Sequence, residues 1–248
     1  MKKGLPSFFT SLGLIAGCIS IVISISYGNL TIAGYFILIA ALFDFIDGFT
    51  ARLVNNVSEF GKQLDSLADV VSFGVAPSMI LYQLVLLSYV KSSPGANFDV
   101  INPAMPQAVI LFSTFLVAVF SALRLAKFNL DPGQTKSFKG LPVPANALFI
   151  TALGFAAETS SSIPASVLVF NRGFLLTIVV LSSYLLVSNI PMFSLKFSSY
   201  GIQKNVIRYT FLIFSAVLLI VFKLPGLAPI ILLYIIMSLI GSRYARTE

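Results

Sequence analysis

Four aspartates stand between positions 44 and 69 of a strongly apolar chain: Asp44, Asp47, Asp65 and Asp69. The whole chain has only nine acidic residues, so this group holds nearly half of them. An ionised carboxylate at membrane depth costs at least ~2.5 kcal/mol, and it persists only where it is paired, bound to metal or facing a wet cavity. No basic cluster of matching size accompanies the four, so the sequence predicts a cation site.

The residue types also limit the choice of metal. The chain has no histidine and a single cysteine, Cys18, so oxygen atoms must hold any metal, which favours Mg²⁺ or Mn²⁺ over zinc or copper. Residues three or four apart share one face of a helix, so Asp44 pairs with Asp47 and Asp65 with Asp69. Two such pairs on neighbouring antiparallel helices could bracket two cations ~3.5–4 Å apart, the spacing that clamps a phosphoryl group during transfer.

Three neighbours of the aspartates suit an anionic ligand. Gly48 follows Asp47 and Gly61 lies one helical turn before Asp65, so a bulky anion could approach the backbone at both glycines. Arg52 can offer a planar fork to a phosphate. Each residue also has a plainer explanation, because glycines commonly pack membrane helices and an arginine near the end of a span commonly anchors it. The joint spacing of these residues favours a diphosphate site.

The elements that must carry these residues are membrane-spanning helices. With 57% hydrophobic and 10% charged residues, the chain is typical of a polytopic membrane protein, and eight apolar stretches are about long enough to cross ~30 Å of hydrocarbon. They lie near residues 7–26, 31–52, 66–90, 106–127, 142–158, 173–193, 206–222 and 225–242. The last two form a tight hairpin or one kinked unit, which leaves seven spans possible. Short loops predict one domain over 1–248, with the first span retained rather than cleaved as a signal.

Lysine and arginine predict the orientation. If the N-terminus is cytoplasmic and eight spans alternate, three basic residues fall outside: Lys91, Arg172 and Lys223. The others fall inside: Lys2, Lys3, Arg52, Lys62, Arg124, Lys127, Lys136, Lys139, Lys196, Lys204, Arg208, Arg243 and Arg246. This bias predicts an even number of spans, both termini and the aspartates on the cytoplasmic side, and segment 91–105 outside. The net charge of +7 then suits an anionic membrane surface rather than nucleic acid.

The aspartates belong to a longer pattern with fixed gaps. It begins with Asp44 and Asp47-Gly48-x-x-Ala51-Arg52, and after eight residues it ends with Gly61-x-x-x-Asp65-x-x-x-Asp69. This pattern matches the signature of the CDP-alcohol phosphotransferase family at every fixed position. The resemblance implies an all-α, polytopic helix bundle in the cell membrane with a six-helix core, so that six of the about eight predicted transmembrane helices would form this core. It also implies a homodimer whose cytoplasm-facing site moves a phosphatidyl group from a CDP-linked lipid to an alcohol and releases CMP.

The resemblance also implies a role for each residue of the pattern. The four aspartates would ligate two divalent cations, Mg²⁺ or Mn²⁺, that bind the diphosphate. Asp65 and Asp69 would be catalytic, with Asp69 as the general base that takes the proton of the attacking hydroxyl. The CDP moiety would be lined by Gly48, Ala51, Arg52 and Gly61.

Further stretches resemble one branch of that family, the phosphatidylserine synthases, which use CDP-diacylglycerol and L-serine. They run from Asp65 to Pro77, from Ser121 to Asn129, from Phe138 to Pro144 and from Val187 to Pro191, and the resemblance leaves residues 206–242 peripheral. The serine carboxylate and ammonium groups need partners, for which Arg124, Lys127 and Lys139 are the candidates and Asn129 and Asn146 weaker ones. Simple anchoring at the cytoplasmic surface explains the three basic residues equally well.

Other functions stay open at this stage. Glycerol phosphate or inositol phosphate could be the acceptor, and an archaeal ether lipid, CDP-archaeol, could be the donor. An ion-coupled transporter could use the carboxylates as a cation path, but such a protein commonly has two related halves, and residues 125–248 hold no second copy of the aspartate pattern. A purely structural membrane protein would leave four acids within spans unexplained.

Overall fold

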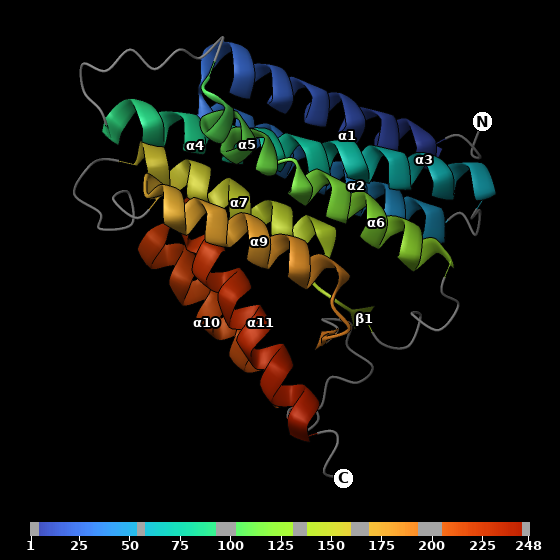
Figure 1. The fold of residues 1–248 in the computed structure, drawn as a ribbon. Coiled ribbons are helices and arrows are strands. Elements are labelled where there is room, and N and C mark those ends of the chain that lie inside the picture. The colour runs from blue at the N-terminus through green and yellow to red at the C-terminus, as the bar shows by residue number, and fades with distance from the viewer. Residues whose placement is uncertain are drawn as a thin grey trace.

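The computed structural model describes residues 5–53, 58–92, 103–130, 138–159, 169–192 and 205–244. Within these ranges the chain forms helical rods: those from α1 to α9 run roughly alongside one another, and the pair α10 and α11 is inclined to them (Figure 1). The rods are α1 Leu5–Val22 with η2 Ile23–Tyr27, α2 Leu30–Leu53, α3 Glu59–Asp69 with η3 Val70–Val75 and α4 Ala76–Ser92, α5 Met105–Ser113 with α6 Leu116–Leu130, α7 Val143–Glu158, α9 Arg172–Val187, α10 Val206–Phe222, and η6 Leu224–Gly226 with α11 Leu227–Tyr244.

The rods correspond to the eight predicted apolar stretches, with two differences in their ends. The third rod begins at Glu59 rather than at 66, because Ser58 caps α3 by accepting a hydrogen bond from the Gly61 N–H at 3.0 Å. The sixth rod ends at Val187 rather than at 193, because the chain then forms β2 Pro191–Met192. This strand pairs antiparallel with β1 Phe138–Lys139, so a two-residue ladder interrupts the otherwise all-α fold.

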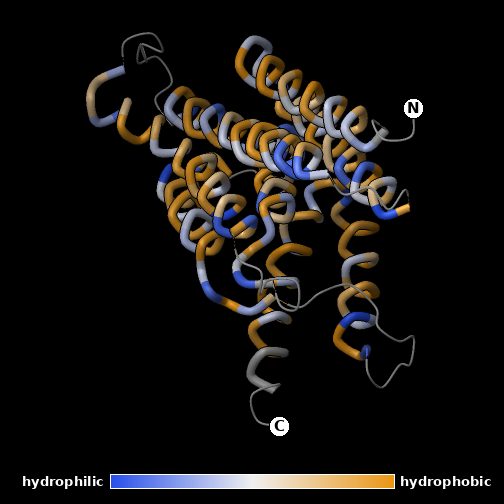
Figure 2. Tube along the Cα trace, turned by 90° about the vertical axis from the view of Figure 1, so that its right-hand side faces the viewer, coloured by the Kyte–Doolittle hydropathy of each residue, from blue (hydrophilic) through white to orange (hydrophobic). Residues whose placement is uncertain are grey.

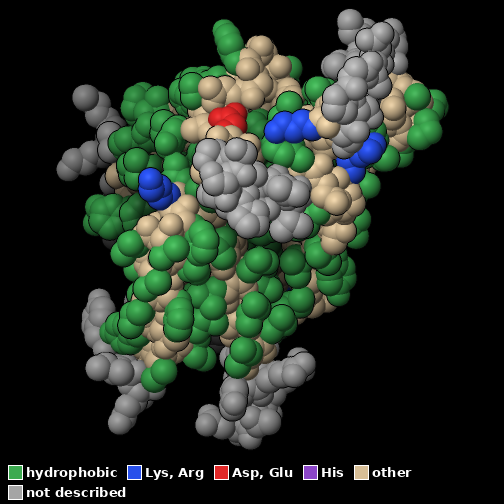
Figure 3. Space-filling model, turned by 90° about the vertical axis from the view of Figure 1, so that its left-hand side faces the viewer, with side chains coloured by type: hydrophobic (Ala, Val, Ile, Leu, Met, Phe, Trp, Pro, Cys, Tyr) green, Lys and Arg blue, Asp and Glu red, His purple; other side chains and the backbone are tan. Residues whose placement is uncertain are grey.

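The helices have the character of a multi-pass membrane protein. Four are long and apolar enough to cross a membrane: Pro6–Tyr27, Leu30–Leu53, Glu59–Lys91 and Met105–Leu130. The α-helices of the other four rods, α7, α9, α10 and α11, are also apolar, with 16 to 18 residues each. Hydrophobic residues run along the helices in Figure 2, and hydrophobic side chains cover much of the end face in Figure 3. The chain is therefore an all-α polytopic membrane protein.

The described basic residues lie at the ends of the rods, as the charge pattern predicts. Lys91, Arg172 and Lys223 lie at the end of the bundle where α4 ends and α9 begins. The end with the aspartates holds Arg52, Lys62, Arg124, Lys127, Lys139 and Arg208. Outside the described ranges lie residues 93–102 of the predicted outer segment and Lys2, Lys3, Lys136, Lys196, Lys204 and Arg246; the Arg243 side chain is also not described.

Small residues let α1 pack closely on its neighbours. A Cβ atom at Gly17 would lie 2.5 Å from the Ser72 Oγ atom, so only glycine allows this approach of α1 to η3. The Ser72 hydroxyl donates to the Gly13 carbonyl at 3.1 Å, and the buried Ser20 hydroxyl donates to the Ala33 carbonyl of α2 at 2.8 Å. These bonds fix α1 between α2 and the third rod, which is where the aspartates lie.

The last two helices form a hairpin rather than one kinked unit. They lie side by side in Figure 1, joined by Leu224–Gly226. A Cβ atom at Gly226 would lie 2.6 Å from the Leu218 carbonyl oxygen, so the hairpin can close this tightly because residue 226 is glycine. Helix α11 packs against α7 and β2, whereas α10 packs mainly against α11. Eight rods are therefore present in the described part of the chain.

Candidate active site

The structure brings the predicted aspartates together at one end of the bundle. The ligand oxygens of Asp44, Asp47 and Asp65 all lie within 4.8 Å of one another. A small hollow of about 10 Å³ is lined by all three and also by Asp69. Asp44 and Asp47 come from α2, and Asp65 and Asp69 come from α3, so each helix contributes one of the two predicted pairs. Asp69 lies one helical turn further into the bundle than Asp65.

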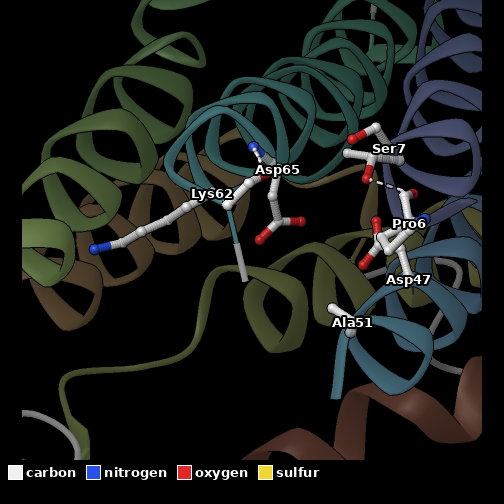
Figure 4. Close-up of a pocket in the computed structure, with 10 residues that line it drawn as sticks. Pro6, Ser7, Asp47, Ala51, Lys62 and Asp65 are labelled. Atoms are coloured by element: carbon white, nitrogen blue, oxygen red, sulfur yellow. Dashed lines mark hydrogen bonds between the residues drawn. The ribbon is translucent and has the colours of Figure 1, made fainter. Parts of the chain in front are cut away.

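Asp47 and Asp65 also border a larger pocket of about 170 Å³. Helix α1 packs against both α2 and α3. Because α2 and α3 make little direct contact with each other, the pocket opens between them. In Figure 4, the carboxylates of Asp47 and Asp65 point into the space between the helices, whereas the Lys62 side chain extends away from them. The lining residues are Pro6, Ser7, Thr10, Asp47, Gly48, Ala51, Ser58, Gly61, Lys62 and Asp65.

Helix α1 contributes residues that the sequence pattern does not identify. Thr10 lines both hollows together with Asp47 and is 5% exposed, and its hydroxyl donates to the Pro6 carbonyl at 3.0 Å. Pro6 and Ser7 line the larger pocket. The only signal for them in the sequence is three small or polar residues at the start of an apolar span, which is too common to identify a site.

The glycines expected near the diphosphate both line the pocket. A Cβ atom at Gly48 would meet no atom within 4 Å among the described residues, so helix packing does not explain this glycine. A Cβ atom at Gly61 would lie 3.0 Å from the Ser58 Oγ atom that caps α3. Ala51 lines the pocket as well, but Arg52 does not; its Nε donates to the Gly48 carbonyl at 2.9 Å and the residue is exposed.

The aspartates have the chemistry of a hard-cation site. One oxygen of Asp47, Oδ2, is buried and has no hydrogen-bond partner in the described part of the chain, although the residue is only 5% exposed. A buried charged oxygen without a partner is costly, and three carboxylates this close repel one another unless a cation lies among them. The ligand set is oxygen only, which fits a hard divalent cation.

The residues expected to bind serine do not form one cluster. Arg124 points into the bundle and is 8% exposed, and its Nη2 donates to the Gly140 carbonyl at 3.4 Å. Lys127 is exposed and donates to the Asn189 side chain at 3.4 Å, and Lys139 is exposed on β1. Arg124 and Lys127, three residues apart on α6, therefore have different surroundings, because one side chain is buried and the other reaches across to the segment after α9.

The two asparagines differ as much as the basic residues do. Asn129 donates to the Ser66 hydroxyl at 2.8 Å, which ties α6 to α3. Asn146, in the first turns of α7, is fully buried, and neither its Oδ1 nor its Nδ2 has a partner among the described residues. A buried amide without partners can hydrogen-bond a polar ligand. Asn146 is thus a better acceptor-site candidate than the sequence indicates.

Comparison with known proteins agrees with this geometry. Residues 3–221 match the family of CDP-alcohol phosphatidyltransferases. The chain belongs to this family. The matched stretch contains the whole aspartate site and Arg124, and it ends before α11.

Relatives of the chain within the family carry two kinds of name. A CDP-diacylglycerol–serine O-phosphatidyltransferase from Helicobacter pylori is 31% identical over 95% of this chain and 89% of its own length. A protein of the same name from Bacillus subtilis is 34% identical over 61% of this chain and 75% of its own. An archaetidylserine synthase from Methanothermobacter thermautotrophicus is 36% identical over 64% of this chain and 62% of its own.

Proposed function

We propose that this chain transfers the phosphatidyl group of CDP-diacylglycerol to the hydroxyl of L-serine, giving phosphatidylserine and CMP. The observation that carries the proposal is the convergence of three carboxylates within 4.8 Å at a pocket between α2 and α3. The names of the relatives support the acceptor, because serine occurs both in the bacterial names and in archaetidylserine synthase. They differ in the lipid that the name implies, so CDP-archaeol is the alternative donor.

The four aspartates are proposed to hold two divalent cations, Mg²⁺ or Mn²⁺. When bound, these cations would neutralise the diphosphate and stabilise the charge that develops on the reacting phosphoryl group. Gly48, Ala51 and Gly61 have small side chains or none, so they leave space in the pocket for the CDP part of the donor. Arg52 is exposed beside this pocket. The described pocket therefore suits the diphosphate end of the donor, with the lipid tails in the bilayer.

The chemical step balances with residues of this chain. The serine hydroxyl oxygen forms a bond to the β-phosphorus, which carries the diacylglycerol, and the bond from that phosphorus to the oxygen of CMP breaks. Asp69 takes the hydroxyl proton, and Asp65 stands between it and the pocket. Arg124 is the proposed partner of the serine carboxylate, since its guanidinium is buried in the bundle and its helix, α6, packs against η3, which directly follows Asp69. Lys127 and Lys139, both exposed, are secondary candidates.

The acceptor is tested by supplying the purified protein with CDP-diacylglycerol and, separately, with L-serine, glycerol 3-phosphate and inositol phosphate, and measuring CMP release. We expect release with L-serine alone, and its loss in Asp65→Asn. Glu59→Gln is the matched control, because Glu59 lies on the same helix but is exposed and does not line the pocket. Release with another acceptor and none with serine would overturn the proposal, and a parallel reaction with CDP-archaeol identifies the donor.

The proposal also includes the membrane arrangement: one domain over 1–248 in the cell membrane, a homodimer by family resemblance, and the aspartate end in the cytoplasm. Orientation is tested in a background without Cys18. A cysteine at Arg172 should react with an impermeant thiol reagent added to intact cells, and a cysteine at Glu59 only after permeabilisation. The reverse labelling would contradict the orientation.

A further inference from the structure

We propose that Asn129, near the end of α6, is a positioning residue for Asp65: through its hydrogen bond to Ser66 it sets how α3 is turned about its axis. This inference rests on the proposed function, in which α3 carries two of the aspartates and α6 carries Arg124. It assigns Asn129 a different role from the direct contact with serine that the sequence suggests. The bond would join the metal-binding side of the site to its acceptor side.

Helix α3 is held by packing on only part of its surface. It packs against α1 and against its own continuation η3, and among the described residues it makes little direct contact with either α2 or α6. The space toward α2 is the pocket, into which the Asp65 carboxylate points (Figure 4). On the side toward α6, the orientation of α3 therefore depends on individual side chains rather than on close helix packing.

Ser66 is the residue of α3 that bonds to α6. Its hydroxyl accepts from the Asn129 Nδ2 at 2.8 Å and donates to the Lys62 carbonyl at 3.1 Å, and both Ser66 and Asn129 are half-buried. Ser66 lies about 100° around the helix from Asp65 and shares a face with Lys62, whose side chain extends away from the carboxylates (Figure 4). The bond thus holds the face of α3 next to the one that carries the acids.

Helix α6 gives this bond a firm support. It packs against η3 and α9. A Cβ atom at Gly74 of η3 would lie 3.2 Å from the Ser121 Cβ atom of α6, so the two helices approach closely at this point. Nearer the end of α6, Lys127 donates to the Asn189 side chain at 3.4 Å. The position of α6 is therefore set by η3, α9 and the segment after α9, and α3 is the element that the bond to Asn129 orients.

A small turn of α3 is enough to disturb the chemistry. The ends of side chains lie about 5–6 Å from a helix axis, so a turn of about 10° moves the Asp65 carboxylate by about 1 Å. A misplacement of this size can lower a rate by up to about 10²-fold. Asp65 would move relative to Asp44 and Asp47 of α2, with which it is proposed to share the cations. Loss of the bond should therefore lower kcat more than it weakens the binding of either substrate.

Asn129→Ala and Ser66→Ala, measured separately, distinguish positioning from substrate contact. We expect kcat for CMP release to fall about tenfold in both, with the KM values for L-serine and CDP-diacylglycerol within about twofold of wild type. Ser66→Thr keeps the hydroxyl and should retain kcat. Ser11→Ala is the matched control, because the Ser11 hydroxyl donates to the Ser7 carbonyl at 2.8 Å within its own helix, and kcat should not change. A higher serine KM in Asn129→Ala alone, or a wild-type kcat in both variants, would overturn the inference and leave the proposed function intact.

A double-mutant cycle tests whether Asn129 acts through Ser66. In the combined Asn129→Ala and Ser66→Ala variant, kcat should fall no further than in the more affected single variant, whereas additive losses would overturn the positioning role. The cycle is also measured in melting temperatures, which need no substrate. Each single variant should melt roughly 2–4 °C lower and the combined variant no lower still, and independent decreases would contradict the bond. If the wild type uses another acceptor, the proposed function fails, and kcat is compared with that acceptor.

Discussion

The two ends of the bundle use carboxylates in opposite ways. At the end away from the pocket, Glu158 closes α7, and its two oxygens accept from the Leu30 N–H at 2.6 Å and the Thr31 N–H at 3.0 Å. These are N–H groups of the first turn of α2, which have no partner within their own helix. At the other end of that same helix, the buried Oδ2 of Asp47 accepts from no group of the described chain.

This difference separates a charge that serves the fold from one that is kept for a ligand. Glu158 neutralises the positive end of a helix and locks α2 to α7, so its interactions are complete without any ligand. The aspartates repel one another and leave a buried oxygen without a partner, so they cost stability until something positive binds. Function in this chain is therefore expected where the carboxylates are not satisfied.

Among variants that distinguish the aspartate end from the Glu158 end, Asp65→Asn is expected to have the largest effect on activity. Removing one member of the aspartate group should lower CMP release by about 10²–10³-fold. The melting temperature without divalent metal should stay the same or rise, because one of three mutually repelling charges is gone. Activity and melting are measured on the same preparation. Near-normal turnover at saturating Mn²⁺ would mean that the unsatisfied carboxylates are not the centre of the chemistry.

A divalent metal should stabilise the protein through the aspartate end of the bundle and not through the Glu158 end. Mg²⁺ or Mn²⁺ at about 100 times its Kd should stabilise the wild-type protein by about 2.7 kcal/mol, and chelation by EDTA should abolish both this gain and the CMP release. The gain should vanish in Asp47→Asn and persist in Glu158→Gln. Thermal melting with and without metal measures it. A metal-dependent shift that survives Asp47→Asn would place the cation elsewhere.

Gly48→Ala should stabilise the helix while impairing the site. Alanine favours an interior helical position over glycine by about 0.5–1 kcal/mol, and a Cβ atom at 48 meets no atom of the described residues within 4 Å. That Cβ atom would extend toward the pocket, so the KM for CDP-diacylglycerol should rise several-fold. A variant with both a higher melting temperature and an unchanged KM would show that the donor does not approach this part of α2.

Glu158→Gln should give the reverse pattern of a stability loss without a change in chemistry. Glutamine has a single acceptor oxygen and no charge for the N-terminus of α2, so we expect a loss of about 1 kcal/mol, or roughly 2–4 °C in melting temperature. CMP release per folded molecule should be unaffected. A fall in turnover as large as that of Asp65→Asn would remove the distinction between the two ends.

The smallest effect is expected for Arg172→Lys at the Glu158 end. Arg172 lies over the Tyr89 ring, with its guanidinium carbon 4.4 Å from the ring centre, a contact that lysine can partly replace. Stability should change by less than about 0.5 kcal/mol and activity not at all. The contrast is Arg124→Lys, which is proposed to raise the serine KM. Equal behaviour of the two variants would mean that Arg124 is only a topological anchor.

The sequence predicts the rods and the meeting of the aspartates because both depend on local rules. Span length follows from apolar runs, and helical spacing places Asp44 with Asp47 and Asp65 with Asp69. The contribution of Thr10 depends instead on which helices pack together, and the family pattern does not include this residue. Arg124 and Lys127 separate for the same reason, since a spacing of three fixes their shared side of α6 but not which of them the neighbouring helices cover.

The π-helical segment Val70–Val75 directly follows Asp69 and precedes the fully buried part of α4. A π turn amounts to one residue added to an α-helix, which advances everything beyond it by roughly 100° around the axis. The two halves of the third rod are thus set at independent angles: the first turns its acids toward α2, and the second turns its apolar side chains into the bundle. Deleting Val70 would restore a uniform helix, and one of the two halves would then face the wrong way.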